Sequence, residues 1–224
     1  MKINIAIDGP SAAGKSTIAK KLAGKLHYVH LDTGAMYRCT GMKAKNTGLD
    51  LEDEQAICAM LKDTTIRLTP EGGVYLDGND VTSRIRTDEI SLAASAISKH
   101  PGVRADLVAR QKQMAQEGGF IMDGRDIGTV VLPDAQVKVF MTASAAARAK
   151  RRYDQNIASG IPSESLETIT KEIEQRDYQD THRSASPLTK APGAVEIDTS
   201  DMTIQQVCDA IWALAEPYVT KEDE

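Results

Sequence analysis

The segment at positions 9–17, GPSAAGKST, constrains the fold of this chain more than any other, because it matches the pattern G-x-x-x-x-G-K-[ST]. This pattern is typical of a P-loop, whose backbone N–H groups surround the phosphates of a nucleotide at the start of a helix. The lysine at this spacing can reach the β- and γ-phosphates, and the hydroxyl of the next residue can ligate Mg²⁺. The residues expected to bind ATP are Gly9, Pro10, Ser11, Ala12, Ala13, Gly14, Lys15, Ser16 and Thr17.

The segments that flank this loop predict a parallel α/β sheet. An apolar segment, INIAID, precedes the loop, and a helical segment, STIAKKLAGKL, follows it. A second apolar segment, YVHLD, comes next, and such alternation of strand and helix is typical of a sheet with parallel strands. Further buried strands are expected in GGFIMDGRD, AQVKVFMTA and GAVEIDTS. The loop therefore has the strand before it and the helix after it that a P-loop requires.

The middle of the chain has a different pattern. Between about 64 and 86, β-branched residues alternate with the turn signals PEGG and DGN, which predicts antiparallel hairpins. We expect a small β-rich insert in a single α/β domain that spans residues 1–224, and a break in helical structure at SGIPS, residues 159–163. Helices are expected at 87–98, 101–117, 143–158, 164–182 and 203–219.

Composition narrows the classes of function. The chain has 27 Lys and Arg against 32 Asp and Glu, a formal net charge of −5, which argues against general nucleic-acid binding. No apolar run approaches the roughly 18 residues of a membrane span. The start MKINIAIDG reaches an aspartate too early for a signal peptide, so a cytoplasmic location is expected. The cysteines, at 39, 58 and 208, are spaced neither as a disulfide framework nor as a zinc site.

Arginines beside acidic residues are the second group of signals. They occur in DTGAMYR, in MDGRD, three times at 148–152, and in RDYQDTHR. Guanidinium groups hold phosphates and neutralise a phosphoryl group during its transfer. The N-K-x-D motif of guanine-binding proteins does not occur in the sequence. This set of residues suits a protein that moves phosphate between two nucleotides.

Four segments together resemble the bacterial cytidylate kinase (CMP kinase) family: GPSAAGKST, LDTGAMYR, DGRDIGTVV and RDYQDTHRSASPL. The resemblance implies a P-loop three-layer sandwich with a central parallel sheet, a β-rich monophosphate-binding insert at 62–100 and a helical lid at 148–166. It also implies phosphoryl transfer from ATP to CMP, and to dCMP, with Mg²⁺ held through ATP and Ser16.

The resemblance further assigns an acceptor site. Arg125 and Asp126 match a pair that recognises the edge of cytosine, and Arg104 a residue on the base or phosphate side. Arg176 and Asp180 match residues near the sugar, and the residue implied to hold the monophosphate is Arg183. The full set implied to contact CMP is Tyr37, Arg38, Ser95, Arg104, Arg125, Asp126, Arg176, Asp180 and Arg183. The catalytic residues implied are Lys15, Arg148, Arg151 and Arg152.

Several assignments have a structural alternative. Arg125 and Asp126 could form an ion pair that caps a turn, and Arg104 could simply border the core. The spacing of the lid arginines, i, i+3 and i+4, also suits a solvated helix face. Asp32 and Asp123 follow predicted strands, and each could bind a water of Mg²⁺ or cap a helix.

The three residues at 176, 180 and 183 fall on one helix face, so pairs that only stabilise the helix would explain them nearly as well.

Two other functions stay open at this stage. A P-loop switch would bind a protein partner according to its nucleotide state and would hydrolyse ATP slowly without an acceptor. A kinase for another small acceptor, such as UMP, shikimate or a nucleoside, would share the P-loop. We expect ATP and CMP or dCMP as partners, no nucleic acid, no membrane, and a monomer.

Overall fold

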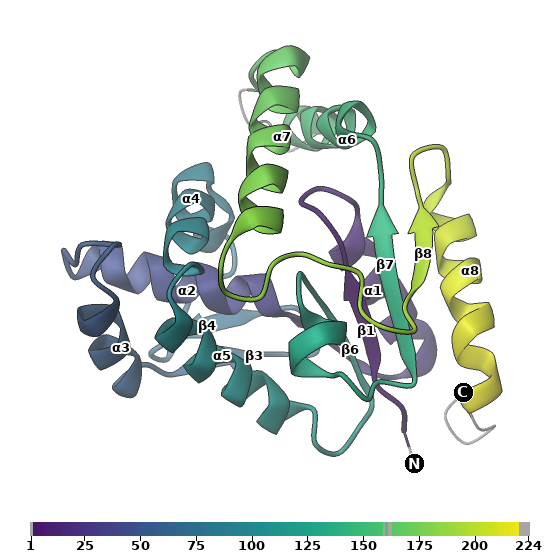
Figure 1. Ribbon diagram of the computed structural model, residues 1–224, viewed down its shortest axis with the longest axis horizontal. Helices are drawn as coiled ribbons and strands as arrows, with labels where there is room; N and C mark the ends of the chain where they lie inside the picture. Colours follow the sequence, from purple (N-terminus) through teal and green to yellow (C-terminus); the bar gives the residue numbers. More distant parts are fainter. Residues whose placement is uncertain (1, 159, 161–162, 220–224) are drawn as a thin grey trace.

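The computed structural model describes residues 2–158, 160 and 163–219, and its central layer is a sheet of five strands in the order β2-β6-β1-β7-β8 (Figure 1). Every neighbouring pair in this sheet is parallel, as the alternation of strands and helices predicts. The strands are β1 (Ile5–Asp8), β2 (Val29–Asp32), β6 (Phe120–Gly124), β7 (Val137–Thr142) and β8 (Val195–Asp198).

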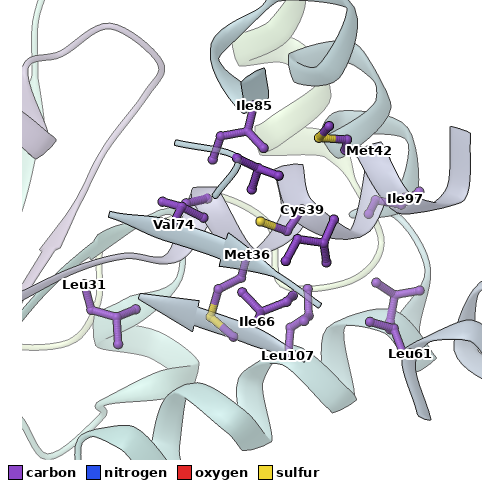
Figure 2. Packing of buried hydrophobic residues seen from close by; sticks show 14 of the residues in the cluster. Leu31, Met36, Cys39, Met42, Leu61, Ile66, Val74, Ile85, Ile97 and Leu107 are labelled. Atoms are coloured by element: carbon purple, nitrogen blue, oxygen red, sulfur yellow. The ribbon is translucent and has the colours of Figure 1, made fainter. Parts of the chain in front are cut away.

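Helices cover both faces of the sheet, because successive side chains of each strand point to opposite faces. In β1, Ile5 and Ile7 lie in a core with α1 and α8, whereas Ala6 lies in a core with α2, α3 and α5. Figure 2 shows side chains of this second core, among them Met36 and Cys39 of α2 and Leu107 of α5. The helices that form these layers are α1 (Lys15–Leu26), α2 (Thr33–Asn46), α3 (Glu54–Lys62), α5 (Pro101–Met114) and α8 (Ile204–Ala215).

The predicted hairpins form a separate antiparallel sheet with the order β3-β4-β5. Its strands are β3 (Ile66–Leu68), β4 (Val74–Leu76) and β5 (Asn79–Asp80), and a short turn, η1 (Arg84–Arg86), leads to α4 (Asp88–Ile97). Gly72 and Gly78 occupy its turns with φ of 88° and 82°, a conformation that glycine adopts without steric cost. The β-rich insert is therefore confirmed.

The helix α5 ends earlier than expected. The sequence pattern predicts a helix to residue 117, but the last helical residue is Met114. Gly118 and Gly119 follow with φ of 75° and 80°, so the chain turns there into β6.

Two further helices, α6 (Ala145–Ala158) and α7 (Leu166–His182), project beyond the carboxyl ends of β7 and β8 (Figure 1). They pack on each other through Ala149, Ile169 and Ile173. Ser165 caps α7, since its side chain accepts a hydrogen bond from the amide of Thr168. The predicted break at 159–163 falls mostly on positions 159, 161 and 162, which lie outside the described residues.

The carboxyl ends of the parallel strands meet at one edge of the sheet, where open α/β sheets bind their ligands. Asp8 at the end of β1 is in register with Gly124 of β6, and Asp32 of β2 is in register with Asp123. The P-loop starts directly after β1, so it lies at this edge. Within the described ranges, no helix is both long enough and apolar enough to cross a membrane.

Candidate active site

The P-loop has the backbone conformation that its glycines predict. Gly9 has a φ of 148°, and a Cβ atom at this position would overlap the carbonyl oxygen of Met141 on β7. Gly14 has a φ of 90° and stands at the N-cap of α1, where it offers no side chain to cap the first amides of the helix. The loop therefore runs against the sheet and leads directly into the helix, with the partial positive charge of the helix end behind it.

Lys15 is buried beside this loop, and its Nζ donates a hydrogen bond of 2.7 Å to the carbonyl oxygen of Pro10. Burial, together with the nearby charge of Arg125, lowers the pKa of Lys15 to about 7. Negative phosphate groups placed next to this ammonium would favour its charged form. The geometry is therefore consistent with the expected contact between Lys15 and nucleotide phosphates.

A group of oxygen atoms lies next to Ser16 at the start of α1. The Ser16 hydroxyl donates a hydrogen bond of 2.8 Å to Oδ2 of Asp123, and Oδ1 of Asp123 lies 2.6 Å from Nε2 of His30. Mg²⁺ prefers such oxygen ligands and is usually held by few protein groups together with phosphates. Within the described part of the chain, no group of three or more His, Cys, Asp or Glu side chains could hold a metal alone. This oxygen set fits a Mg²⁺ that arrives with ATP.

The two aspartates with open roles differ in their contacts. Asp32 caps α2, because its Oδ1 accepts from the amide of Ala35, and its Oδ2 accepts from Arg86 over 2.9 Å. Asp123 lies inside β6 and bonds Ser16 and His30. The helix cap is therefore found for Asp32, whereas for Asp123, which contacts Ser16, the binding of a Mg²⁺ water stays a prediction.

A cavity of about 160 Å³ opens at the end of the P-loop. Ser11, Ala12, Lys15 and Ser16 line one side of it, and α2, α4, α5 and α7 contribute the other sides. All nine residues that the family resemblance assigns to the acceptor line this cavity, namely Tyr37, Arg38, Ser95, Arg104, Arg125, Asp126, Arg176, Asp180 and Arg183. The fold thus brings together residues that span more than half of the sequence.

Positive charge is concentrated on one part of this cavity. Burial lowers the pKa of Arg38 and Arg183, and it lowers the pKa of Arg176 to about 10 with a further contribution from Arg125. Asp180 partly offsets this charge, since its Oδ2 accepts from Nε of Arg125 over 2.8 Å. Arg38, Arg176 and Arg183 stand beside Arg125, whose pKa is raised despite its burial because of Asp180. Such a concentration of guanidinium groups forms a site for an anion.

Several polar atoms around the cavity have no hydrogen-bond partner among the described residues. They are buried, and such groups are rare in folded proteins unless a ligand or water satisfies them. The atoms at the cavity are the hydroxyl of Tyr37, Nε of Arg104, Nε of Arg176 and Nη2 of Arg183. Four unsatisfied donors beside one cavity indicate a polar ligand with several acceptors.

Arg125 and Asp126 do not form an ion pair with each other, so the alternative of a turn-capping pair is wrong. Asp126 instead pairs with Nη2 of Arg104, and both side chains are less than a tenth exposed. Arg125 instead pairs with Asp180, which lines the same cavity as Arg38, Arg176 and Arg183. These two adjacent residues of the loop after β6 have different partners, which the sequence does not show. The acid and the arginine that face each other in the cavity are therefore Asp126 and Arg104.

Arg104 also has a role beyond the border of the core. Its Nη1 donates to the carbonyl oxygen of Ser98 over 3.3 Å, and its guanidinium lies 5.5 Å from the centre of the Tyr37 ring.

Pairs within one helix, the alternative for Arg176, Asp180 and Arg183, explain only some of the contacts that these residues make. Arg183 Nη1 lies 3.8 Å from Oδ1 of Asp180, a contact within one turn. Arg176 instead donates to the hydroxyl of Ser91 on α4, and Asp180 bonds Arg125 after β6.

The three lid arginines have three different partners. Arg148 is buried, so a solvated helix face is wrong for this residue; it donates to the P-loop carbonyl of Ser11 over 3.1 Å and to both oxygens of Asp177. Arg151 donates to the hydroxyl and carbonyl oxygens of Thr199. Arg152 pairs with Asp88 at the start of α4. The base of α6 is thus fixed to the P-loop, and its next turn reaches towards the insert.

A second cavity, of about 410 Å³, lies on the other side of the P-loop. Gly14, Thr17 and Ile18 line it, together with Arg151 and Arg152. The loop after β8 and the first turn of α8 close it with further residues that the sequence pattern did not indicate, namely Thr199, Met202, Ile204 and Val207. Their position after the carboxyl end of a late parallel strand is the signal that could have identified them.

Comparison with known proteins gives a consistent result. The family model for cytidylate kinase matches residues 5–217. The chain is 51% identical to the cytidylate kinase of Geobacillus kaustophilus over 94% of this chain and 95% of that protein. It is also 51% identical to the cytidylate kinase of Bacillus subtilis, with the same two coverages. A solved structure of an uncharacterized protein from Eubacterium ventriosum has a similar fold, with a TM-score of 0.53, 12% identity, and 97% and 99% of the two chains covered.

Proposed function

Because this chain belongs to the cytidylate kinase family, we propose that it transfers the γ-phosphoryl group of ATP to CMP, and to dCMP, giving ADP with CDP or dCDP. The observation that carries this proposal is the continuous cavity between Lys15 and the residues of the acceptor site. The residues that line it include several arginines and the Arg104–Asp126 pair. A nucleoside monophosphate has the matching distribution, with an anionic phosphate at one end and a polar base at the other.

The phosphate of CMP is assigned to the arginine cluster. Arg38, Arg125 and Arg183 line the cavity together with Lys15. Arginine binds phosphate through parallel N–H donors, and these groups keep their charge at any physiological pH. Arg176 and Asp180 line the same cavity, and we assign them to the sugar hydroxyl groups.

The base is assigned to the Arg104–Asp126 pair. Cytosine presents an amino donor next to two acceptors, whereas uracil presents an acceptor in place of that amino group. The carboxylate of Asp126 can accept from the cytosine amino group and repels the uracil oxygen. Arg104 can donate to the acceptors, with its unsatisfied Nε available, and Ser95 lies in the same cavity. This arrangement favours CMP over UMP.

The donor nucleotide is assigned to the P-loop and the second cavity. The triphosphate would follow residues 9–17, and the adenine base would enter the cavity beside Thr199 and Met202. Ser16 and Asp123 would hold Mg²⁺, which supplies charge neutralisation at the phosphates. Arg151 and Arg152 of α6 also line this cavity, and we assign them to the transferring phosphoryl group.

Chemistry in this site needs no general base. The second pKa of a phosphate monoester is near about 6, so most CMP carries a dianionic phosphate at neutral pH. An oxygen of that phosphate attacks the γ-phosphorus of ATP, a new O–P bond forms, and the bond to the β-phosphate oxygen breaks. The residues contribute by alignment and by neutralising charge, as is usual for phosphoryl transfer.

The organisation of the chain follows from these assignments. We infer a single domain over residues 1–224, in which 62–100 is the monophosphate-binding insert and 148–166 is the lid. Closure of the lid would exclude water, which competes with CMP as the acceptor. All proposed contacts come from one chain, which supports a monomer. ATP and CMP as substrates, and bacterial relatives, favour a cytoplasmic location.

The proposal is tested by measuring ADP formation from ATP and Mg²⁺ with CMP, dCMP, UMP, shikimate or no acceptor. We expect fast turnover only with CMP and dCMP, and much slower turnover with UMP. Lys15→Met, prepared in the same way, controls for contaminating kinases. Turnover that does not depend on an acceptor would support a nucleotide switch and would contradict the proposal.

A further inference from the structure

Asp8 connects the start of the P-loop to the loop that carries Arg125 and Asp126. It is the last residue of β1 and directly precedes Gly9. Its buried carboxylate accepts two backbone hydrogen bonds, Oδ1 from the amide of Ile127 over 2.8 Å and Oδ2 from the amide of Gly128 over 2.7 Å. The nucleotide motif does not include this residue, and it lines neither of the two cavities.

The two amides belong to a tight turn, η2 (Ile127–Val131), that begins directly after Asp126. Within the turn, Val130 and Val131 donate to the carbonyl oxygen of Asp126, and the first amides have no acceptor in the turn itself. Such amides at the start of a helical turn require an outside acceptor when they are buried. Asp8 supplies it from a neighbouring strand.

This contact affects Asp126 because of its position. Asp126 stands immediately before the turn, where an aspartate commonly uses its own side chain to cap the amides that follow. Here its side chain makes no cap and pairs with Arg104 in the acceptor cavity. Since Asp8 already satisfies those amides, the carboxylate of Asp126 is free to face the cavity.

Neighbouring residues also pack closely against this turn at Gly128, and this packing fixes the position of the turn. A Cβ atom on Gly128 would stand 3.0 Å from Cβ of Ala191 and 3.4 Å from Oδ2 of Asp8. Only a residue without a side chain fits at this distance without a shift of the turn or of its neighbours.

We propose that Asp8 is a positioning residue for base selection: by capping the turn after Asp126, it holds the Asp126 carboxylate on Arg104 and towards the acceptor base. The proposal rests on the proposed function, in which Asp126 and Arg104 recognise cytosine. Without the Asp8 carboxylate, Asp126 would rotate to cap its own turn. Arg104 would then lose its partner, and discrimination between CMP and UMP would fall.

The test compares Asp8→Asn and Asp8→Ala with the wild type. Asparagine can accept a hydrogen bond from one of the two amides, but its own N–H group opposes the other amide. The CMP-over-UMP ratio of Asp8→Asn should therefore lie between those of the wild type and Asp8→Ala. Asp53→Asn is the matched control, because Asp53 also accepts a backbone amide, from Ala56 over 3.0 Å, and lines neither cavity. Assays near about pH 8 keep Asp8 ionised, since burial raises its pKa only to about 6.

For Asp8→Ala we expect the KM for CMP to rise about tenfold or more and the CMP-over-UMP ratio of kcat/KM to fall by a similar factor. The KM for ATP should stay within about twofold, and the values for Asp53→Asn should match the wild type. Hydrogen exchange at the amides of Ile127 and Gly128 should become faster in the Asp8 variants. A merely structural role would instead weaken CMP, UMP and ATP alike.

Other outcomes separate this inference from the function on which it rests. If the wild type does not phosphorylate CMP, the proposed function fails whatever the variants do. If the wild type does so, and Asp8→Asn and Asp8→Ala keep its CMP-over-UMP ratio, the role of Asp8 is refuted. Should the Asp8 variants not fold, Gly128→Ala decides, because it shifts the same turn and leaves Asp8 in place. An unchanged ratio in that variant would refute the proposal.

Discussion

Replacement of Asp126 by asparagine is the sharpest test of how the acceptor base is recognised. Asp126→Asn keeps the size of the side chain and removes its charge. In the wild type, the side chains of Asp126 and Arg104 are 8% and 6% exposed, so solvent screens their interactions only weakly. A lost hydrogen bond to a charged group costs about 1.5–3 kcal/mol, which corresponds to roughly 10- to 150-fold in kcat/KM for CMP.

The effect on UMP should have the opposite sign. The carboxylate of Asp126 repels the uracil oxygen, whereas the amide of asparagine can donate a hydrogen bond to it. We therefore expect kcat/KM for UMP to stay constant or rise. The CMP-over-UMP ratio of kcat/KM should fall by at least the factor by which kcat/KM for CMP falls. The KM for ATP should change little, because neither Asp126 nor Arg104 lines the cavity that is assigned to the donor nucleotide.

The assay measures initial rates of ADP formation with each acceptor at saturating ATP. Removal of one partner leaves the buried Arg104 without its carboxylate, which can cost several kcal/mol of unfolding free energy, so the thermal midpoint must be measured as well. Asp106→Asn is the control, because it removes the charge of an Asp–Arg pair within α5 that lines neither cavity. A wild-type CMP-over-UMP ratio in folded Asp126→Asn would refute the reasoning.

The remaining predictions concern the donor side of the site. Lys15→Met should lower kcat by about 10²–10³-fold with the fold intact, as judged by circular dichroism; near-normal turnover would contradict its phosphate contact. Because burial lowers the pKa of Lys15 to about 7 and phosphates favour its charged form, ATP binding near about pH 8 should take up close to one proton, and affinity should fall as the pH rises above about 7. Calorimetry in two buffers of different ionisation enthalpy measures this uptake, which should vanish in Lys15→Met. Arg152→Ala should reduce kcat more than it raises the KM for CMP. Arg148→Ala should also lower the thermal midpoint, since Arg148 holds Ser11 and Asp177. If both variants keep the kcat and the thermal midpoint of the wild type, the lid arginines have no such role.

Much of the architecture could be predicted because the signals are local. The P-loop spacing, the apolar strands and the glycine turns of the insert each depend on a few neighbouring residues, and each appears in the structure where expected. The cavity residues could be named only through the family resemblance, since they come from helices and loops far apart in the sequence.

The pairing of these residues could not be predicted. Arg125 and Asp126 are neighbours in the loop after β6, yet they bind different partners, Asp180 and Arg104. Arg148, Arg151 and Arg152 share one helix face, yet the loops and helices that approach this face give each arginine a different acceptor. Such contacts depend on tertiary packing, and neither residue spacing nor helical periodicity contains that information.

The most direct measurement of the central claim follows the transferred group itself. ATP labelled with ³²P at the γ-position is incubated with the protein, Mg²⁺ and CMP, and the products are separated. We predict that the label appears in CDP, that UMP takes up label far more slowly, and that little inorganic phosphate is released when CMP is absent. Label released as inorganic phosphate at the same rate with and without CMP would contradict the account.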